Sequence, residues 1–436
     1  MIDSSFRIGA EWRDATPEGG RDVARIRVEA GSQVLSRILD MASGDVRDYF
    51  RASSVSLALW LADNWWRLRW EPLAGVKPSY DWRTRHELSS AGGGYNWPPI
   101  MVYGTGPRVV LAPAFGGRVS SGPVRYLDMD TVHVMPGDHF EAGVDRFVGQ
   151  VIANCANAQD GPALAKLFAE LNEERSDTEI AAWRAMEARL GFDPDAAPAD
   201  LIEDLGRKEL ALGRRGVEEA AAAFPSLRAA RMLDEAVEAS AASKLVVSVG
   251  IGNLVDPLTF DPREPAWRWG EDAARKVRHR LGVTSGAFPV EAFEDLLQAS
   301  WSELAQAPAT ADRLPYAALL RKGSETANLA LQMRPLPLRR FELARMVADM
   351  FWMRGETLGV VSRAKTERQK FQRAFAQSLL CPFSEVRRYI DLEDPTDAQM
   401  RSAARALGVH VSAIKTLLVN RNVLPRETLL DRLEAA

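Results

Sequence analysis

The chain has 436 residues, of which 46% are hydrophobic and 26% are charged, and its formal net charge is −4. This length predicts two or three globular domains, and the composition excludes a disordered chain. The acidic balance provides no global attraction to nucleic acid, although it is compatible with a local basic patch.

The first expected domain, residues 1–155, is rich in Gly and Trp, and its apolar residues alternate with polar ones in short runs. The pattern predicts strands at 23–28, 109–113 and 126–135 and a short helix at 55–68. We therefore expect a mixed α/β domain dominated by antiparallel strands.

The pattern then changes to helical periodicity over residues 156–243, which we expect to form a helical region. The expected helices are 163–175, 178–190, 201–212 and 217–224. A connecting segment, 244–284, follows with a strand at 245–249 and a helix at 267–281.

The last expected domain, residues 285–436, begins with a helix at 290–301. The runs 315–320 and 328–333 predict a hairpin that leads into a helix containing Phe341. The chain as a whole is therefore predicted to be a multidomain α+β protein.

Two runs in this last domain resemble the zinc peptidases of the ImmA/IrrE family. They are the lead-in Leu338, Arg339, Arg340, Phe341, Leu343 and Ala344, and the later frame Phe375, Ala376, Leu379, Leu380 and Pro382. The resemblance covers about a third of the chain. It implies a zincin-like fold with a small helical end that packs beside it.

The residues that would bind and activate zinc in that family are missing from the frame. Arg345 stands at the first His of the His-Glu-x-x-His motif, Met346 at the general-base Glu and Asp349 at the second His. Gln369 stands at the third ligand, which is a Glu in the family. Of these side chains only the carboxylate of Asp349 is a good ligand for such a cation. The sequence therefore predicts a scaffold without hydrolysis, no catalytic residues and no cofactor.

The same helix also has a purely structural interpretation. Glu342, Arg345 and Asp349 form a narrow polar stripe on an apolar run. In this interpretation Arg345 and Asp349 pair as residues i and i+4. If the stripe instead lines the former cleft, the pair fills the space of the metal.

Six of the twelve tryptophans lie between residues 60 and 97, with arginines among them. Aromatic rings beside guanidinium groups are typical of interfaces with proteins and of stacking sites for unpaired bases. The candidate interface residues are Trp65, Trp66, Arg67, Arg69 and Trp82. The alternative is that these rings form the core of the first domain.

Two further groups of residues are weaker candidates. His133 and His139 lie near Asp128, Asp130 and Asp138, which is the one cluster with ligand chemistry, but the spacing fits no metal motif. Near the end, Ala404, Gly408 and Ile414 have the spacing of a helix-turn-helix, in which Lys415 and Arg421 would face phosphate.

Cys155 and Cys381 lie too far apart in the sequence to suggest a disulfide framework, and we expect both to be buried. Neither a signal segment nor an apolar run of membrane-spanning length is present. We therefore expect a cytoplasmic protein with no membrane association.

Three functional hypotheses follow. The first is a non-catalytic ImmA/IrrE-like pseudo-peptidase that acts as a regulatory or sensing protein and binds a protein partner. The resemblance implies a bacterial stress, phage-defence or mobile-element setting, because family members cleave repressors or antitoxin-like regulators. The alternatives are a transcriptional regulator that binds DNA or RNA and a metallopeptidase with an unconventional site.

Overall fold

The computed structural model describes residues 5–12, 22–73, 78–114, 122–129, 131–250, 264–352 and 356–425. These residues have a mixed α/β structure, and their contacts divide the chain into two compact units with a boundary after Pro198. Among the helices of the described parts, none combines the length and the apolar character needed to cross a bilayer.

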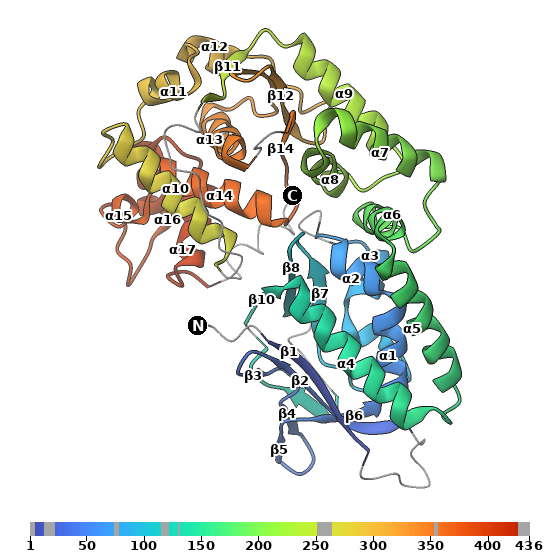
Figure 1. Ribbon diagram of the computed structural model, residues 1–436. Coiled ribbons are helices and arrows are strands. Elements are labelled where there is room, and N and C mark those ends of the chain that lie inside the picture. Colours follow the sequence, from blue (N-terminus) through green and yellow to red (C-terminus); the bar gives the residue numbers. More distant parts are fainter. Residues whose placement is uncertain are drawn as a thin grey trace. The chain divides into compact units, whose positions relative to one another are not determined.

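The strands of the first unit form three small antiparallel sheets (Figure 1). One contains β1 (Phe6–Glu11), β2 (Val23–Ala30), β3 (Gln33–Val34) and β6 (Phe50–Ser53). The second contains β4 (Ile38–Asp40), β5 (Val46–Arg47) and β9 (Val124–Tyr126). The third contains β7 (Ile100–Gly104), β8 (Arg108–Pro113) and β10 (His133–Pro136).

The helices of this unit bury the apolar faces of these sheets, and α4 packs along β1 (Figure 1). They are α1 (Ser54–Asp63), α2 (Trp65–Trp70), α3 (Tyr80–His86), the 3₁₀ helix η1 (Leu88–Ala91), α4 (Gly137–Cys155), α5 (Gly161–Ser176) and α6 (Thr178–Arg189). The central core combines Phe6 and Ile26 from the strands with Leu57, Phe140 and Phe147 from the helices.

Two elements of this unit differ from the prediction. The expected helix 55–68 is divided at Asn64, whose side-chain amide donates to the carbonyl of Trp60 at 2.8 Å and so competes with helix continuation. The expected strand 126–135 is also divided, because Asp128 adopts a left-handed conformation with φ of 57°.

The second unit contains the described residues from Ala199 onward. Its helices are α7 (Ala199–Leu212), α8 (Arg214–Ala223), α9 (Ala229–Ala242), α10 (Ala266–Arg280), α11 (Val290–Leu297), α12 (Trp301–Gln306), α13 (Leu336–Trp352), α14 (Glu367–Leu380), α15 (Phe383–Val386), α16 (Asp397–Leu407) and α17 (Val411–Asn420). Its strands are β11 (Val246–Ser248), β12 (Ala317–Lys322), β13 (Thr326–Ala330) and β14 (Leu358–Val361). The helices of 156–243 are thus divided between the units, with α5 and α6 in the first and α7 to α9 in the second.

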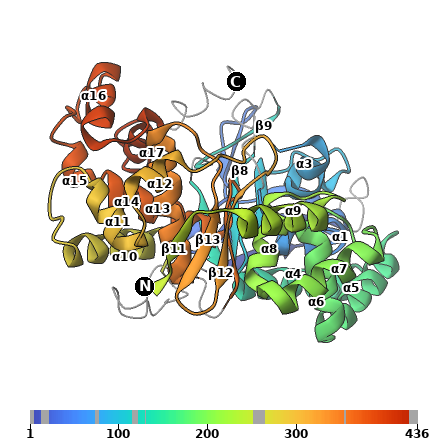
Figure 2. The same cartoon turned by 90° about the horizontal axis from the view of Figure 1, so that it is seen from above.

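The four strands of the second unit form one antiparallel sheet in the order β11-β13-β12-β14, and β12 and β13 are the predicted hairpin. Successive side chains of a strand point to opposite faces. Ala317 and Leu319 of β12 join the large core that contains α13 and α14. The opposite face packs against α9 (Figure 2).

The lead-in residues of α13 attach this helix to its surroundings. The buried Arg339 guanidinium donates to the carbonyl oxygens of Met333, Ala305 and Ala307 at 2.6, 2.9 and 2.6 Å. Arg340 donates to the carbonyl of Phe288 at 2.5 Å. The two arginines therefore satisfy carbonyls before α11, at the end of α12 and before α13, and connect the first turn of α13 to these segments.

Candidate functional site

The four frame positions on α13 and α14 are brought together beside strand β14. Asp349 and Gln369 have no exposed surface, and Arg345 is partly buried. Met346, at the general-base position, is fully buried in the hydrophobic core. Thr366 caps α14, because its hydroxyl accepts from the backbone N–H of Gln369 at 3.2 Å, and so places Gln369 in the first turn.

Both carboxylate oxygens of Asp349 are saturated by donors. Arg368 donates from Nε to Oδ1 at 2.6 Å and from Nη2 to Oδ2 at 2.8 Å. The side-chain amide of Gln372 donates to Oδ1 at 2.6 Å, and the backbone N–H of Val360 donates to Oδ2 at 3.1 Å. A carboxylate offers about four lone-pair sites, and these four donors occupy them. Asp349 therefore has no lone pair left for a metal.

The ion pair that the structure shows for Asp349 is with Arg368 of α14, not the expected i, i+4 pair with Arg345. Arg345 instead donates from Nη2 to the carbonyl of Ser362 at 2.7 Å and to the side-chain oxygens of Gln369 and Gln372. Burial lowers the pKa of Arg345, and the nearby Arg373 lowers it further.

Gln369 is held on both ends of its amide. Its oxygen also accepts from the backbone N–H of Ser362 at 2.9 Å, and its nitrogen donates to the carbonyl of Val360 at 2.9 Å. The side chain thus acts as a bridge between α14 and β14.

These residues do not fit a zinc ion. The three ligand positions hold a guanidinium, a saturated carboxylate and an amide whose oxygen faces that guanidinium. The Arg345 guanidinium brings a positive charge to the position of a metal ligand, and it has no lone pair with which to bind a metal ion. Elsewhere in the described ranges, no three His, Cys, Asp or Glu side chains are grouped so that they could hold a metal.

Two carboxyl groups complete the buried network around Arg368. Glu219 of α8 accepts from the Thr366 hydroxyl, and Glu356 lies 3.8 Å from Nη1 of Arg368. Burial is the main cause of the raised pKa of both groups, and Arg368 opposes the shift in each case. The polar network therefore joins α8, α13, β14 and α14 within the second unit.

Sequence reasoning missed Arg368, Gln372 and Glu219. Gln372 lies four residues after Arg368 and three after Gln369, so helical periodicity could have grouped it with both. Glu219 lies 147 residues before Thr366, and nothing in the local pattern of α8 indicates that contact.

The raised pKa of Glu219 leads to a pH prediction. Between pH 4.5 and the raised pKa of Glu219, the buried carboxyl keeps a proton that an ordinary Glu in the unfolded chain has lost. The folded state binds more protons in this range, so stability falls as pH rises. Glu219→Gln removes this slope, which is at most about 1.4 kcal/mol per pH unit. Urea unfolding at pH 5 and pH 7 should show that the variant gains stability relative to wild type at pH 7. A gain at pH 5 that disappears at pH 7 would contradict the assignment.

The Trp and Arg residues of the candidate interface lie in the core of the first unit. Trp65, Trp66 and Trp82 are at most 5% exposed, and Arg67 and Arg69 are also buried. The structure thus favours the core alternative, since these rings leave almost no surface for a partner.

Acids of the same unit neutralise these two buried arginines. Arg67 pairs with Glu71 at 2.6 Å, and its second guanidinium nitrogen lies 3.0 Å from Asp81. Arg69 pairs with Glu141 at 2.7 Å. Each charge is therefore matched inside the fold, as a buried guanidinium requires.

The weaker metal candidates are not assembled into a site. His133 is partly buried in β10, and burial lowers its pKa, whereas His139 is exposed in the first turn of α4. Asp128 lies 3.4 Å from Arg37, and Asp130 falls outside the described residues. Both cysteines are buried and free, as expected.

The predicted pair of C-terminal helices is present as α16 and α17. Gly408 ends α16 with φ of 65°, and Ile414 and Leu417 are buried against it. Lys415 is ion-paired with Asp397 at 2.7 Å, and Arg421 is ion-paired with Glu271 at 2.8 Å. Both cations are therefore engaged within the second unit.

We compared the chain with known protein families, curated proteins and solved structures. No protein-family model, no curated protein and no solved structure matches this chain.

Proposed function

We propose that this chain is a non-catalytic protein of the ImmA/IrrE type, which uses the scaffold of a zinc peptidase to bind a regulatory protein partner without cleaving it. The setting that goes with this proposal is a bacterial stress, phage or mobile-element response. The proposed lack of catalysis is supported by the residues at the motif positions. The proposed biological setting is supported only by the resemblance to the family.

The observation that carries the proposal is the closed network around Asp349. A hydrolase of this type needs an open coordination position and a base that can reach a bound water. Here the base position is Met346 in the core, and the four donors on Asp349 leave no lone pair. The network also carries a bidentate ion pair, which makes it a rigid structural element.

The first test is the metal content of the purified full chain by inductively coupled plasma mass spectrometry. We expect well below one zinc or manganese ion per chain, and we expect added chelator to leave the melting temperature unchanged. Near-stoichiometric metal that resists dialysis would overturn the proposal.

A pair of variants tests the frame alignment itself. The triple variant Arg345→His, Met346→Glu, Asp349→His lacks a third ligand, so we expect neither tight zinc binding nor peptidase activity. Adding Gln369→Glu supplies that ligand, and this quadruple variant is expected to bind zinc more tightly than the triple variant. Zinc titrations followed by calorimetry, with circular dichroism to monitor folding, measure the difference. Robust cleavage by the triple variant would contradict the alignment.

A further inference from the structure

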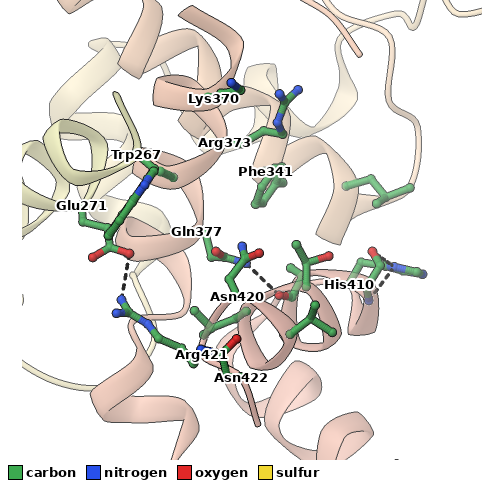
Figure 3. Close-up of a pocket in the computed structure, with 17 residues that line it drawn as sticks. Trp267, Glu271, Phe341, Lys370, Arg373, Gln377, His410, Asn420, Arg421 and Asn422 are labelled. Carbon is green, nitrogen blue, oxygen red and sulfur yellow. Dashed lines mark hydrogen bonds and ion pairs between the residues drawn. The ribbon is translucent and has the colours of Figure 1, made fainter. Parts of the chain in front are cut away.

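A pocket of about 540 Å³ lies in the second unit among α10, α13, α14 and α17 (Figure 3). It is separate from the network around Asp349, because none of the side chains of that network lines it. Its volume is within the usual range of small-molecule sites, about 300–1,000 Å³. The pocket therefore has room for one small ligand.

The charge of the lining is predominantly positive. Lys370 and Arg373 of α14 line one side, Arg421 lines another, and Glu271 is the single carboxylate among the lining residues. Glu271 forms an ion pair with Arg421 at 2.8 Å, and the other two lining cations, Lys370 and Arg373, both lie on α14. Figure 3 shows the Lys370 and Arg373 side chains next to each other on that side.

A further cation, Lys365, interacts electrostatically with the two lining cations of α14. Lys365 is in the loop before α14, and Arg373 reaches back to that loop, where it donates to the carbonyl of Ala364 at 3.1 Å. Burial, together with the nearby cations Arg373, Lys370 and Arg345, lowers the pKa of Lys365 to about 8. Like charges gathered in a partly buried place repel one another, and an anion relieves that repulsion.

One acid does lie close to these cations. Glu367 accepts from Lys370 at 3.1 Å, but its side chain is only 3% exposed, and it also accepts from the backbone N–H of Ala266. Among the residues that line the pocket, three are cations, Lys370, Arg373 and Arg421, and one is a carboxylate, Glu271. A lining of this composition favours an anionic ligand.

The remaining lining is aromatic and apolar. Phe341 of α13 lies at the centre of the view in Figure 3, and Trp267 of α10 is 42% exposed, unusually open for its size. Leu338, Ala374 and Leu417 add apolar surface, and Asn420 and Asn422 offer amide donors and acceptors. This combination suits a planar ring with polar edges.

We propose that this pocket binds a small molecule that joins a planar aromatic ring to a phosphate group, which is the chemistry of a mononucleotide. The phosphate lies beside Lys370 and Arg373, and the ring lies against Phe341 and Trp267. The proposal does not depend on the resemblance to zinc peptidases, because the pocket residues that carry it are not the metal-ligand positions.

The test is isothermal titration calorimetry on the full chain at about 0.15 M salt, with adenosine and guanosine 5′-monophosphate as probes. Adenosine and inorganic phosphate are titrated separately. We expect saturable one-to-one binding of at least one mononucleotide, and binding of each half-probe weaker by about tenfold or more, since each half makes only part of the contacts.

Three variants locate the binding. Lys370→Gln removes a charge-assisted contact with the phosphate and is expected to weaken the mononucleotide by about tenfold. Trp267→Ala is expected to weaken the mononucleotide and leave inorganic phosphate unchanged. Arg275→Gln is the matched control, because Arg275 lies on α10, is 73% exposed and does not line the pocket. Circular dichroism melting checks that all three variants fold.

Several results would overturn the proposal. One is the absence of saturable mononucleotide binding at concentrations on the order of 1 mM. A second is equal affinity for inorganic phosphate and the mononucleotide. A third is the same loss of affinity in Arg275→Gln as in Lys370→Gln. Because the readout is ligand binding and not metal content, failure here is distinguishable from failure of the proposed function.

Discussion

Asp349→Ala is expected to lower the free energy of unfolding by about 3–5 kcal/mol, the usual cost of removing one partner of a buried ion pair. The Arg368 side chain is 3% exposed, so without Asp349 its guanidinium loses a bidentate acceptor that water does not readily replace. The N–H of Val360 loses the Asp349 carboxylate as its acceptor, and the amide of Gln372 keeps only the carbonyl of Val360. Equilibrium unfolding in urea, followed by circular dichroism, measures the loss.

The double variant Asp349→Leu, Arg368→Met is the matched control. It removes both charges and replaces them with apolar side chains, so we expect it to be more stable than Asp349→Ala alone. Arg368 also faces Glu219 and Glu356, and the loss of these interactions keeps the recovery incomplete. A loss below about 1 kcal/mol for Asp349→Ala would show that the pair contributes little to the fold.

The hairpin and α13 could be predicted because each has a local signal. The hairpin of β12 and β13 follows from two short apolar runs, and α13 follows from an amphipathic run, whereas the frame on α14 comes from the resemblance. The grouping of Arg345, Asp349 and Gln369 came from the resemblance to a known motif, and these side chains do lie together beside β14.

The partners of these side chains could not be predicted. An i, i+4 spacing made Arg345 the nearest cation to Asp349 along the chain, but the geometry of α14 brings Arg368 to the carboxylate with two parallel donors. That choice depends on how α13 and α14 pack. Tertiary packing is not encoded in the spacing of one helix.

The tryptophan-rich segment illustrates a different limit. Sequence reasoning treated aromatic rings beside arginines as either interface or core, because both environments use the same residue types. Glu71 pairs with Arg67 at a local spacing of four residues, but other acids are distant in sequence: Glu141 lies 72 residues after Arg69, and Asp193 lies 126 residues after Arg67. Only the folded chain shows that these arginines are neutralised inside the first unit.

Gly270→Ala is expected to destabilise the second unit by about 1–3 kcal/mol, because α10 and α14 pack backbone to backbone at this position. A Cβ at residue 270 would lie 2.6 Å from the carbonyl oxygen of Phe371 and 2.8 Å from the backbone nitrogen of Phe375. Backbone atoms cannot rotate away as a flexible side chain can. The two helices would therefore have to separate, which loosens the contacts of Ala273 and Ala274 with the shared core. Urea unfolding measures the change.

Gly206→Ala is the matched control, because the same substitution in another helix of the same unit meets no atom within 4 Å. There the added Cβ only reduces the freedom of the unfolded chain, and we expect a gain of about 0.5–1 kcal/mol. If Gly270→Ala lowers the free energy of unfolding and Gly206→Ala raises it, the loss at Gly270 comes from close helix packing and not from helix propensity. Equal gains for both would mean that α10 and α14 are not held in contact at Gly270, and the core that supports the α13 and α14 network would then need a different explanation.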